Sequence, residues 1–176
     1  LNEGDFVTVI GGNGAGKSTT LNMIAGVYPI DSGKITIDGI NISRAPEFKR
    51  AKYIGRVFQD PMMGTAAGMQ IQENLALAFR RGEKRGLGWG IKANEKDSYR
   101  EALARLGLGL EDRMTSKVGL LSGGQRQALT LLMATLKRPK LLLLDEHTAA
   151  LDPKTAAKVL ELTEELVSED NLTTLM

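Results

Sequence analysis

The chain reads Gly11-Gly12-Asn13-Gly14-Ala15-Gly16-Lys17-Ser18 directly after an apolar, β-branched run at residues 6–10. Glycine has no Cβ, so the four glycines of this stretch let the backbone bend closely around a ligand. A helix is expected from Ser18 to about Gly26, and its amino-terminal dipole would favour an anion at the same place. The stretch therefore predicts a cradle for the phosphate chain of a nucleotide, rather than a glycine-rich turn that binds nothing.

The residues of this cradle have separate expected roles. The loop over residues 11–16 would wrap the β-phosphate with its backbone amides. Lys17 would neutralise charge on the β- and γ-phosphates, and the hydroxyl of Ser18 would ligate Mg²⁺. Thr19 is expected close to the α-phosphate. The sequence thus predicts binding of a nucleotide together with magnesium.

Apolar runs with strand periodicity alternate with helical ones along the chain. Strands are expected at residues 6–10, 53–58, 141–144 and 173–176. The first of them is expected to be buried. Residues Ala156, Val159, Leu160, Thr163, Leu166 and Val167 recur at helical spacing. Such alternation predicts an α/β fold with a mostly parallel sheet flanked by helices. A strand at 34–37 followed by Asp38-Gly39 predicts a small antiparallel β region.

The middle of the chain is mostly helical in pattern. Helices are expected near residues 70–80, 94–106 and 123–136, with a glycine-rich, basic surface loop at 80–92. We expect a single domain over residues 1–176. Within it, residues 1–61 and 137–176 would form the catalytic core, and residues 62–136 an inserted helical subdomain.

Two carboxylates follow the strand at residues 141–144. Asp145 would reach Mg²⁺ directly or through water, as in other proteins that hydrolyse nucleotides with a phosphate loop. Glu146 would orient or deprotonate the attacking water. Many strands end in acidic turns, so this assignment depends on the phosphate cradle earlier in the chain. Together, the two motifs predict nucleotide hydrolysis.

A second glycine-rich stretch reads Leu121-Ser122-Gly123-Gly124-Gln125. Serine is a favoured first residue of a helix, and the unpaired amides behind it could hold a phosphate together with the hydroxyl. An ordinary serine helix cap is the alternative interpretation of these residues. Asp152 before Pro153 is likewise typical of a helix start.

With these motifs in this order, the chain resembles the nucleotide-binding domain of an ABC transporter over essentially all of its 176 residues. The implied fold is that of the P-loop nucleoside triphosphatases, and the implied ligand is ATP. The family's signature sequence is matched without a substitution, which implies that ATP contacts Ser122, Gly123, Gly124 and Gln125. The resemblance further implies that Gln59, in Val57-Phe58-Gln59-Asp60-Pro61, senses Mg²⁺ and the γ-phosphate.

The resemblance also implies partners. In the family, two such domains pair head to tail as a homodimer or with another ABC domain, and each signature closes over ATP held by the other phosphate loop. Asp152, in Ala150-Leu151-Asp152, would link the two sites along this seam. Residues 145–152 resemble those of importers for amino-acid-like solutes. We therefore expect a peripheral ATPase on the cytoplasmic face of the membrane that powers import through a separate permease, supplied by a solute-binding protein.

Two features of the family are not found in this sequence. The switch histidine expected just after the strand that starts at Thr173 is missing, as is the aromatic residue that usually precedes the first strand and stacks on adenine. His147 stands after Glu146, where many relatives have proline, and we interpret it as a local loop variant. Both ends of the sequence look cut, which favours a part of a longer protein.

Composition and charge exclude other classes of function. The 23 Lys and Arg nearly balance the 21 Asp and Glu, so we expect no nucleic-acid partner. The absence of cysteine excludes disulfides and thiolate metal sites. The longest apolar runs fall short of the roughly 20 residues that cross a bilayer. A soluble ABC protein acting on ribosomes is the alternative function, whereas residues 121–125 disfavour a nucleotide kinase or a GTPase.

Overall fold

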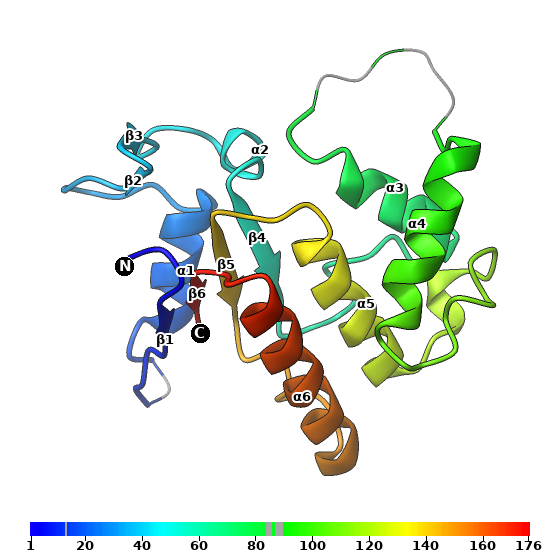
Figure 1. Ribbon diagram of the computed structural model, residues 1–176. Helices are drawn as coiled ribbons and strands as arrows, with labels where there is room; N and C mark the ends of the chain where they lie inside the picture. The colour runs from blue at the N-terminus through cyan, green and yellow to red at the C-terminus, as the bar shows by residue number, and fades with distance from the viewer. Residues whose placement is uncertain (13, 84–85, 87–89) are drawn as a thin grey trace.

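The computed structural model describes residues 1–12, 14–83, 86 and 90–176. Within these residues, a four-stranded parallel sheet forms the centre of the molecule (Figure 1). Its spatial order is β1 (Phe6–Val7), β6 (Thr174–Leu175), β5 (Leu141–Leu144) and β4 (Ile54–Val57). The short strands β2 (Thr36–Ile37) and β3 (Ile40–Asn41) form a separate antiparallel hairpin. The predicted α/β fold class is therefore confirmed.

Side chains of the central strands alternate between the two faces of the sheet. Leu141 and Leu143 pack on one face with Leu21 of α1 (Lys17–Ala25). Leu142 and Leu144 pack on the other face with residues of α5 (Gly123–Thr135) and α6 (Pro153–Glu169). Strand β5 is thus buried on both sides, which explains its uninterrupted run of leucine.

Helices α3 (Ile71–Phe79) and α4 (Ala93–Ala104) lie beyond α5, at the right of Figure 1. An ion pair between Arg80 and Glu95, with 2.8 Å between nitrogen and oxygen, joins the end of α3 to the start of α4. Helix α5 packs against α3 and α4 and also against β4 and α6. It therefore connects the sheet to the helices that the sequence predicts as an inserted subdomain. The predicted loop at 80–92 falls partly outside the described residues.

Some local predictions differ from the structure. The first strand is shorter than expected and is not buried: Phe6 is 48% and Ile10 91% exposed. The reason is that β1 lies at an edge of the described sheet, paired on one side with β6. Leu160 is also exposed, because the buried side of α6 runs through Val159 and Leu162 instead. The short helices α2 (Glu47–Arg50) and η1 (Val118–Leu120) were not predicted.

Arg50 is a buried arginine whose charge is surrounded by carbonyl groups. It is 2% exposed, and its guanidinium donates four hydrogen bonds of 2.7–2.9 Å, to the carbonyl oxygens of Met23, Ile24, Ser43 and Ala45. Two of these oxygens belong to the last turn of α1. Gly26, just after α1, has φ 91°, and a Cβ there would meet Arg50 Nε at 2.7 Å. Arg50 thereby ties the end of α1 to the segment that follows the β2–β3 hairpin.

Replacing Arg50 by methionine should therefore destabilise the chain strongly. The variant keeps most of the apolar stem but leaves buried carbonyl groups without donors, so we expect a loss of about 2–4 kcal/mol in the free energy of unfolding. Urea unfolding measures this loss. The control is Lys49→Met, an exposed position on the same short helix, which should change the stability by less than about 0.5 kcal/mol. Equal stability of the two variants would contradict the assigned role.

Candidate functional site

The phosphate-cradle residues connect β1 to α1. Gly14 and Gly16 have φ values of 82° and 88°, a region that side-chain-bearing residues rarely adopt. A Cβ on Gly11 would lie 2.9 Å from that of Ala15, so the turn is also tight. Gly12 is exposed, and Asn13 lies outside the described residues. The glycines therefore allow the loop a backbone conformation that residues with side chains would rarely adopt.

Lys17 begins α1 and turns its ammonium group back toward the loop. Its Nζ donates to the carbonyl oxygens of Gly11 at 2.7 Å and Gly12 at 3.3 Å. The same nitrogen lies 3.6 Å from Oε1 of Glu146. The ammonium group of Lys17 thus lies between the loop and the Glu146 carboxylate. Its positive charge can act on an anion bound in the loop.

Ser18 and Asp145 are brought together from positions far apart in the sequence. The Ser18 hydroxyl donates to Oδ1 of Asp145 at 3.0 Å. The backbone amide of Asp145 donates to the carbonyl of Val57 at 3.1 Å, which fixes the residue at the end of β5. Thr19 follows in the first turn of α1 and is exposed. A hydroxyl and a carboxylate therefore meet directly beneath the loop.

These oxygens fit a magnesium ion. Mg²⁺ prefers oxygen ligands and in nucleotide sites takes only one or two from the protein, with phosphates and water completing the shell. The Ser18 hydroxyl and the Asp145 carboxylate are such a pair. Among the described residues, no cluster of three or more acidic, histidine or cysteine side chains could hold a metal by itself. The donor set thus suits a metal that arrives with a nucleotide.

Glu146 has an unusual backbone conformation. Its φ is 45°, in the left-handed region, which for a residue other than glycine costs of the order of 1–3 kcal/mol and persists only where its surroundings hold it. Its carbonyl accepts a hydrogen bond from the amide of Ala149 at 2.9 Å, which closes a turn. The side chain is 48% exposed and faces Lys17. A cavity of about 360 Å³ beside the ends of β5 and β6 is lined in part by Lys17, Asp145, Glu146 and His147.

Gln59 follows β4 at the same edge of the sheet and is exposed. The buried Gln127 of α5 donates from Nε2 to the carbonyl of Phe58 at 3.1 Å, which holds the backbone just before it. Within the described residues, Gln59 makes no hydrogen bond to the phosphate loop or to Asp145. Its role toward Mg²⁺ stays a prediction.

Ser122 caps α5 as expected. Its Oγ accepts from the amide of Gln125 at 3.3 Å, and Gln125 Oε1 accepts from the amide of Ser122 at 3.2 Å, so the two form a reciprocal cap. Ser122 and Gly123 are exposed at the helix start. Gly124 is buried for a different reason: a Cβ on it would lie 2.1 Å from Cγ2 of Thr155. The glycine lets α5 and α6 approach closely.

Asp152 caps the neighbouring helix α6. Its Oδ1 accepts from the amide of Thr155 at 3.1 Å. Hydrogen bonds from the hydroxyl and then the amide of Thr155 lower the pKa of this exposed carboxyl. Because Thr155 also packs against Gly124, the starts of α5 and α6 form one continuous surface. Figure 1 shows the start of α5 well apart from the start of α1, so one chain does not bring the signature residues to its own phosphate loop.

Arg56, which contacts Asp145, was not singled out by the sequence, and His147 was interpreted there only as a local loop variant. Arg56 of β4 places Nη2 3.4 Å from Oδ2 of Asp145 and stacks on the ring of Phe58, 4.5 Å from its centre. A charged residue within an apolar strand was the one available signal. His147 is only 2% exposed, and its Nε2 lies 3.0 Å from Oγ1 of Thr163. Being buried, it is more than the loop variant expected from the sequence.

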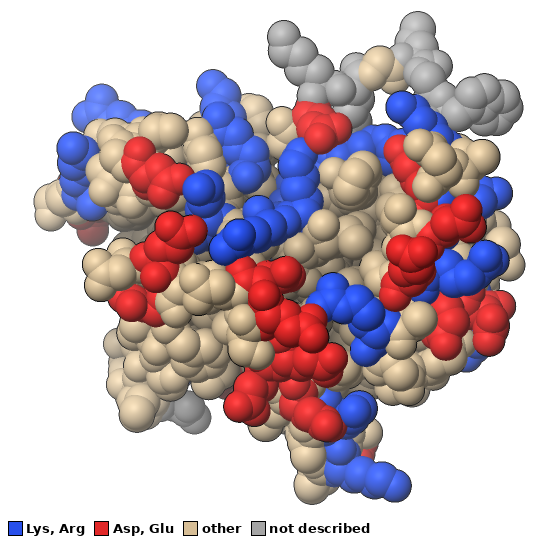
Figure 2. Space-filling view, viewed as in Figure 1, with Lys and Arg blue, Asp and Glu red and all other residues tan. Residues whose placement is uncertain are grey.

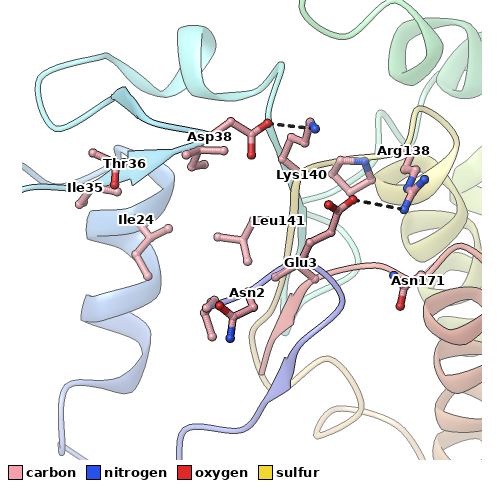
Figure 3. A pocket seen from close by; sticks show the side chains of 14 residues that line it. Asn2, Glu3, Ile24, Ile35, Thr36, Asp38, Arg138, Lys140, Leu141 and Asn171 are labelled. Carbon is pink, nitrogen blue, oxygen red and sulfur yellow. Dashed lines mark ion pairs between the residues drawn. The ribbon is translucent and has the colours of Figure 1, made fainter.

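A separate cavity lies at the opposite edge of the sheet. It also has a volume of about 360 Å³, and Figure 3 shows two ion pairs at its rim, Asp38 with Lys140 and Glu3 with Arg138. Apolar side chains such as Ile24 form its floor. None of the described residues that line it belongs to the predicted nucleotide site. This cavity is therefore separate from the chemistry predicted from the sequence.

A glycine-rich loop between a strand and a helix, with a hydroxyl and a carboxylate beneath it, defines a P-loop nucleoside triphosphatase. The chain belongs to the ABC transporter family, whose model matches residues 1–149. It is thus an ATP-binding subunit of an ABC transporter, and an ATPase. The family prediction is confirmed.

Similar proteins agree with this assignment. A tyrosine transport ATP-binding protein of Clostridioides difficile is 47% identical over 176 residues, which are 100% of this chain and 70% of that protein. An energy-coupling factor transporter ATP-binding protein of Latilactobacillus sakei is 35% identical over 99% of this chain, which spans 59% of its length. These relatives are transport proteins, which favours transport over the ribosome-associated alternative.

Solved structures show the same fold. A dimeric ATP-binding cassette in a post-hydrolysis state, bound to ADP and Pi, superposes with a TM-score of 0.80 at 30% identity. The match covers 99% of this chain and 75% of that one. The prediction of a nucleotide ligand is thereby supported for the family.

The burial of His147 should make stability depend on pH. Desolvation lowers the pKa of this histidine from 6.5 to about 4. The unfolded chain therefore takes up a proton near pH 6.5, whereas the folded chain stays neutral until about pH 4. We expect the free energy of unfolding to fall by up to about 3 kcal/mol from this group as the pH is lowered through that window.

Urea unfolding of the wild type and of His147→Gln at several pH values isolates this effect. Carboxylates titrate in both proteins, but only the wild type has a histidine to protonate, since the sequence contains one histidine. The stability difference between the two should therefore become less favourable to the wild type toward pH 4. A difference that is constant with pH would contradict the prediction.

Proposed function

We propose that this chain binds Mg-ATP through residues 11–19, hydrolyses it with Glu146, and so drives import of an amino-acid-like solute through a separate membrane permease. The observation that carries the proposal is the convergence of Lys17, Ser18, Asp145 and Glu146 at one edge of the sheet. These residues come from two segments more than a hundred positions apart, yet they meet within hydrogen-bond or ion-pair distance.

The chemistry assigned to each residue follows from its position. The backbone amides of the loop and the ammonium of Lys17 would hold the β- and γ-phosphates. Ser18, Asp145 and, through its amide oxygen, Gln59 would hold the magnesium ion, which supplies positive charge to the phosphates. Glu146, whose carboxylate is exposed beside Lys17, would orient the attacking water and accept its proton.

The site is proposed to be completed by a second domain. Ser122 and Gly123 are exposed at the start of α5 and lie far from the phosphate loop of the same chain (Figure 1). In a head-to-tail pair, Ser122, Gly123, Gly124 and Gln125 would instead face ATP held by the partner. Asp152 is next to this surface through Thr155 and would lie on the seam. Related cassettes have been solved as dimers, which supports the pairing.

The membrane partner is also a proposal. None of the described helices is long and apolar enough to span a membrane. We place the chain at the cytoplasmic face, bound peripherally to permease subunits that a solute-binding protein supplies. The tyrosine transport relative, at 47% identity, supports an amino-acid-like solute.

Two substitutions separate binding from turnover. Lys17→Ala should weaken ATP binding by on the order of a hundredfold, because the charge beside the loop is lost. Glu146→Gln should keep binding within a fewfold but stop steady-state hydrolysis, because the amide cannot accept a proton. Calorimetry measures the ATP affinity, and the rate of phosphate release measures hydrolysis. Uptake of labelled tyrosine into vesicles that contain the permease should stop in both variants.

The matched controls are Lys34→Ala and Glu164→Gln, both exposed and outside the site. They should bind and hydrolyse ATP as the wild type does. Hydrolysis by Glu146→Gln at the wild-type rate would show that another group acts as the base.

Ser122→Arg tests the pairing. The larger, charged side chain should leave ATP binding to the monomer unchanged but prevent ATP-dependent dimerisation, because Ser122 would face the partner's phosphates across the seam. The solution mass of Glu146→Gln with and without the second substitution measures this. Ser98→Arg, an exposed serine on α4, is the control and should dimerise normally. Unchanged dimerisation of Ser122→Arg would remove the signature residues from the interface.

A further inference from the structure

A buried hydrogen bond between side chains joins the segment that carries Glu146 to α6. His147 follows Glu146 directly and is 2% exposed. Its Nε2 lies 3.0 Å from the hydroxyl oxygen of Thr163, which is 4% exposed in the middle of α6. The two residues are sixteen positions apart along the chain, so the contact ties the loop after β5 to the inner side of α6.

The direction of this hydrogen bond follows from the other bond that Thr163 makes. Its hydroxyl lies 2.7 Å from the carbonyl oxygen of Val159, in the preceding turn of α6, and donates to it. A hydroxyl has one hydrogen, so toward His147 the oxygen can only accept. With the hydroxyl hydrogen directed at Val159, we assign the ring as the donor from Nε2, in the neutral tautomer with Nδ1 unprotonated.

Thr163 is placed on the inner side of α6. The outer side carries acidic side chains, among them the exposed Glu161, Glu164 and Glu165, and Figure 2 shows acidic residues gathered over this helix. The inner side is otherwise apolar, with Val159, Leu162 and Leu166 buried. The hydroxyl of Thr163 is thus a polar group enclosed in an apolar interface and aimed at the catalytic segment.

We propose that His147 is a positioning residue for hydrolysis: its Nε2–H anchors the segment to Thr163 and so holds the carboxylate of Glu146 beside Lys17. The backbone of Glu146 has φ 45°, a strained conformation that persists only where its surroundings hold it. The hydrogen bond of the next residue, His147, is one contact that holds it. The inference rests on the proposed role of Glu146 as the base. His147 itself touches neither nucleotide nor water in this role.

The anchor also reaches the proposed seam. Helix α6 begins at the Asp152 cap, and Thr155 in its first turn packs against Gly124 of the signature segment. His147, the proposed anchor of Glu146, is therefore bonded to α6, and the first turn of the same helix packs against Gly124. A shift of α6 relative to β5 would displace Glu146 and Thr155 together.

Thr163→Val and Thr163→Ser form a matched pair for the test. Valine has nearly the shape of threonine but no hydroxyl, whereas serine keeps the hydroxyl. We expect kcat for ATP to fall on the order of tenfold in Thr163→Val, with KM within about twofold, because the base is misplaced while the phosphate loop is intact. Thr163→Ser should retain most of the wild-type kcat. A purely structural role would not separate kcat from KM in this way.

A second readout does not depend on turnover. The chain contains one histidine, so the ring nitrogens of His147 give unambiguous signals in ¹⁵N NMR spectra of the labelled protein. The wild type and Thr163→Ser should show the Nε2–H tautomer with a protected N–H proton. In Thr163→Val this proton should exchange faster and the tautomer ratio should change.

Unchanged kcat in a folded Thr163→Val protein would overturn the proposal, whether or not the NMR signal changes. If that variant does not fold, His147→Leu and His147→Gln replace it. Glutamine keeps an N–H donor and leucine does not, so equal kcat in these two would also overturn the proposal. Wild-type hydrolysis by Glu146→Gln would instead refute the proposed base, and the NMR spectra would still show whether the anchor exists.

Discussion

Strand β5 is hydrogen-bonded to β4 on one side and to β6 on the other, and all four of its leucines are buried. A shift by one residue would move the charged side chain of Lys140 or of Asp145 into a position that a buried leucine now occupies. The position of Asp145 is therefore fixed by the packing of β5 together with the hydrogen bond from its amide to Val57. The Ser18 hydroxyl, the Arg56 guanidinium and the turn at Glu146 are all arranged around that fixed carboxylate.

Close approach of helices and strands explains two glycines, Gly55 and Gly124, by packing within the chain. A Cβ on Gly55 of β4 would lie 2.6 Å from the carbonyl oxygen of Ala134 in α5, and one on Gly124 would collide with Thr155 of α6. These contacts place α5 directly against the sheet and against α6. The same signature glycine thus serves packing in the chain, while Ser122 and Gly123 stay exposed for the proposed partner.

The sequence was sufficient to locate the candidate residues that are neighbours in the chain. The phosphate loop, the segment at Ser122 and the Asp145-Glu146 pair are contiguous motifs. Short apolar runs located most strands, and apolar residues at helical spacing located most helices. Contacts that depend on strand register and on packing could not be predicted from the sequence. Arg56 meets Asp145 because β4 and β5 are paired in parallel, and His147 meets Thr163 because α6 turns that side inward. The exposure of β1 also required knowing that it lies at an edge.

The buried state of His147 has a consequence for the whole chain. Histidine is the side chain whose ordinary pKa lies between about pH 5 and 8, and this chain has a single one. Burial lowers the pKa of that residue to about 4. Acidification or alkalinisation around neutrality therefore leaves the charge of the ring beside Glu146 unchanged. The charge next to the candidate catalytic carboxylate is therefore the same on either side of neutrality, although a histidine adjoins it in the sequence.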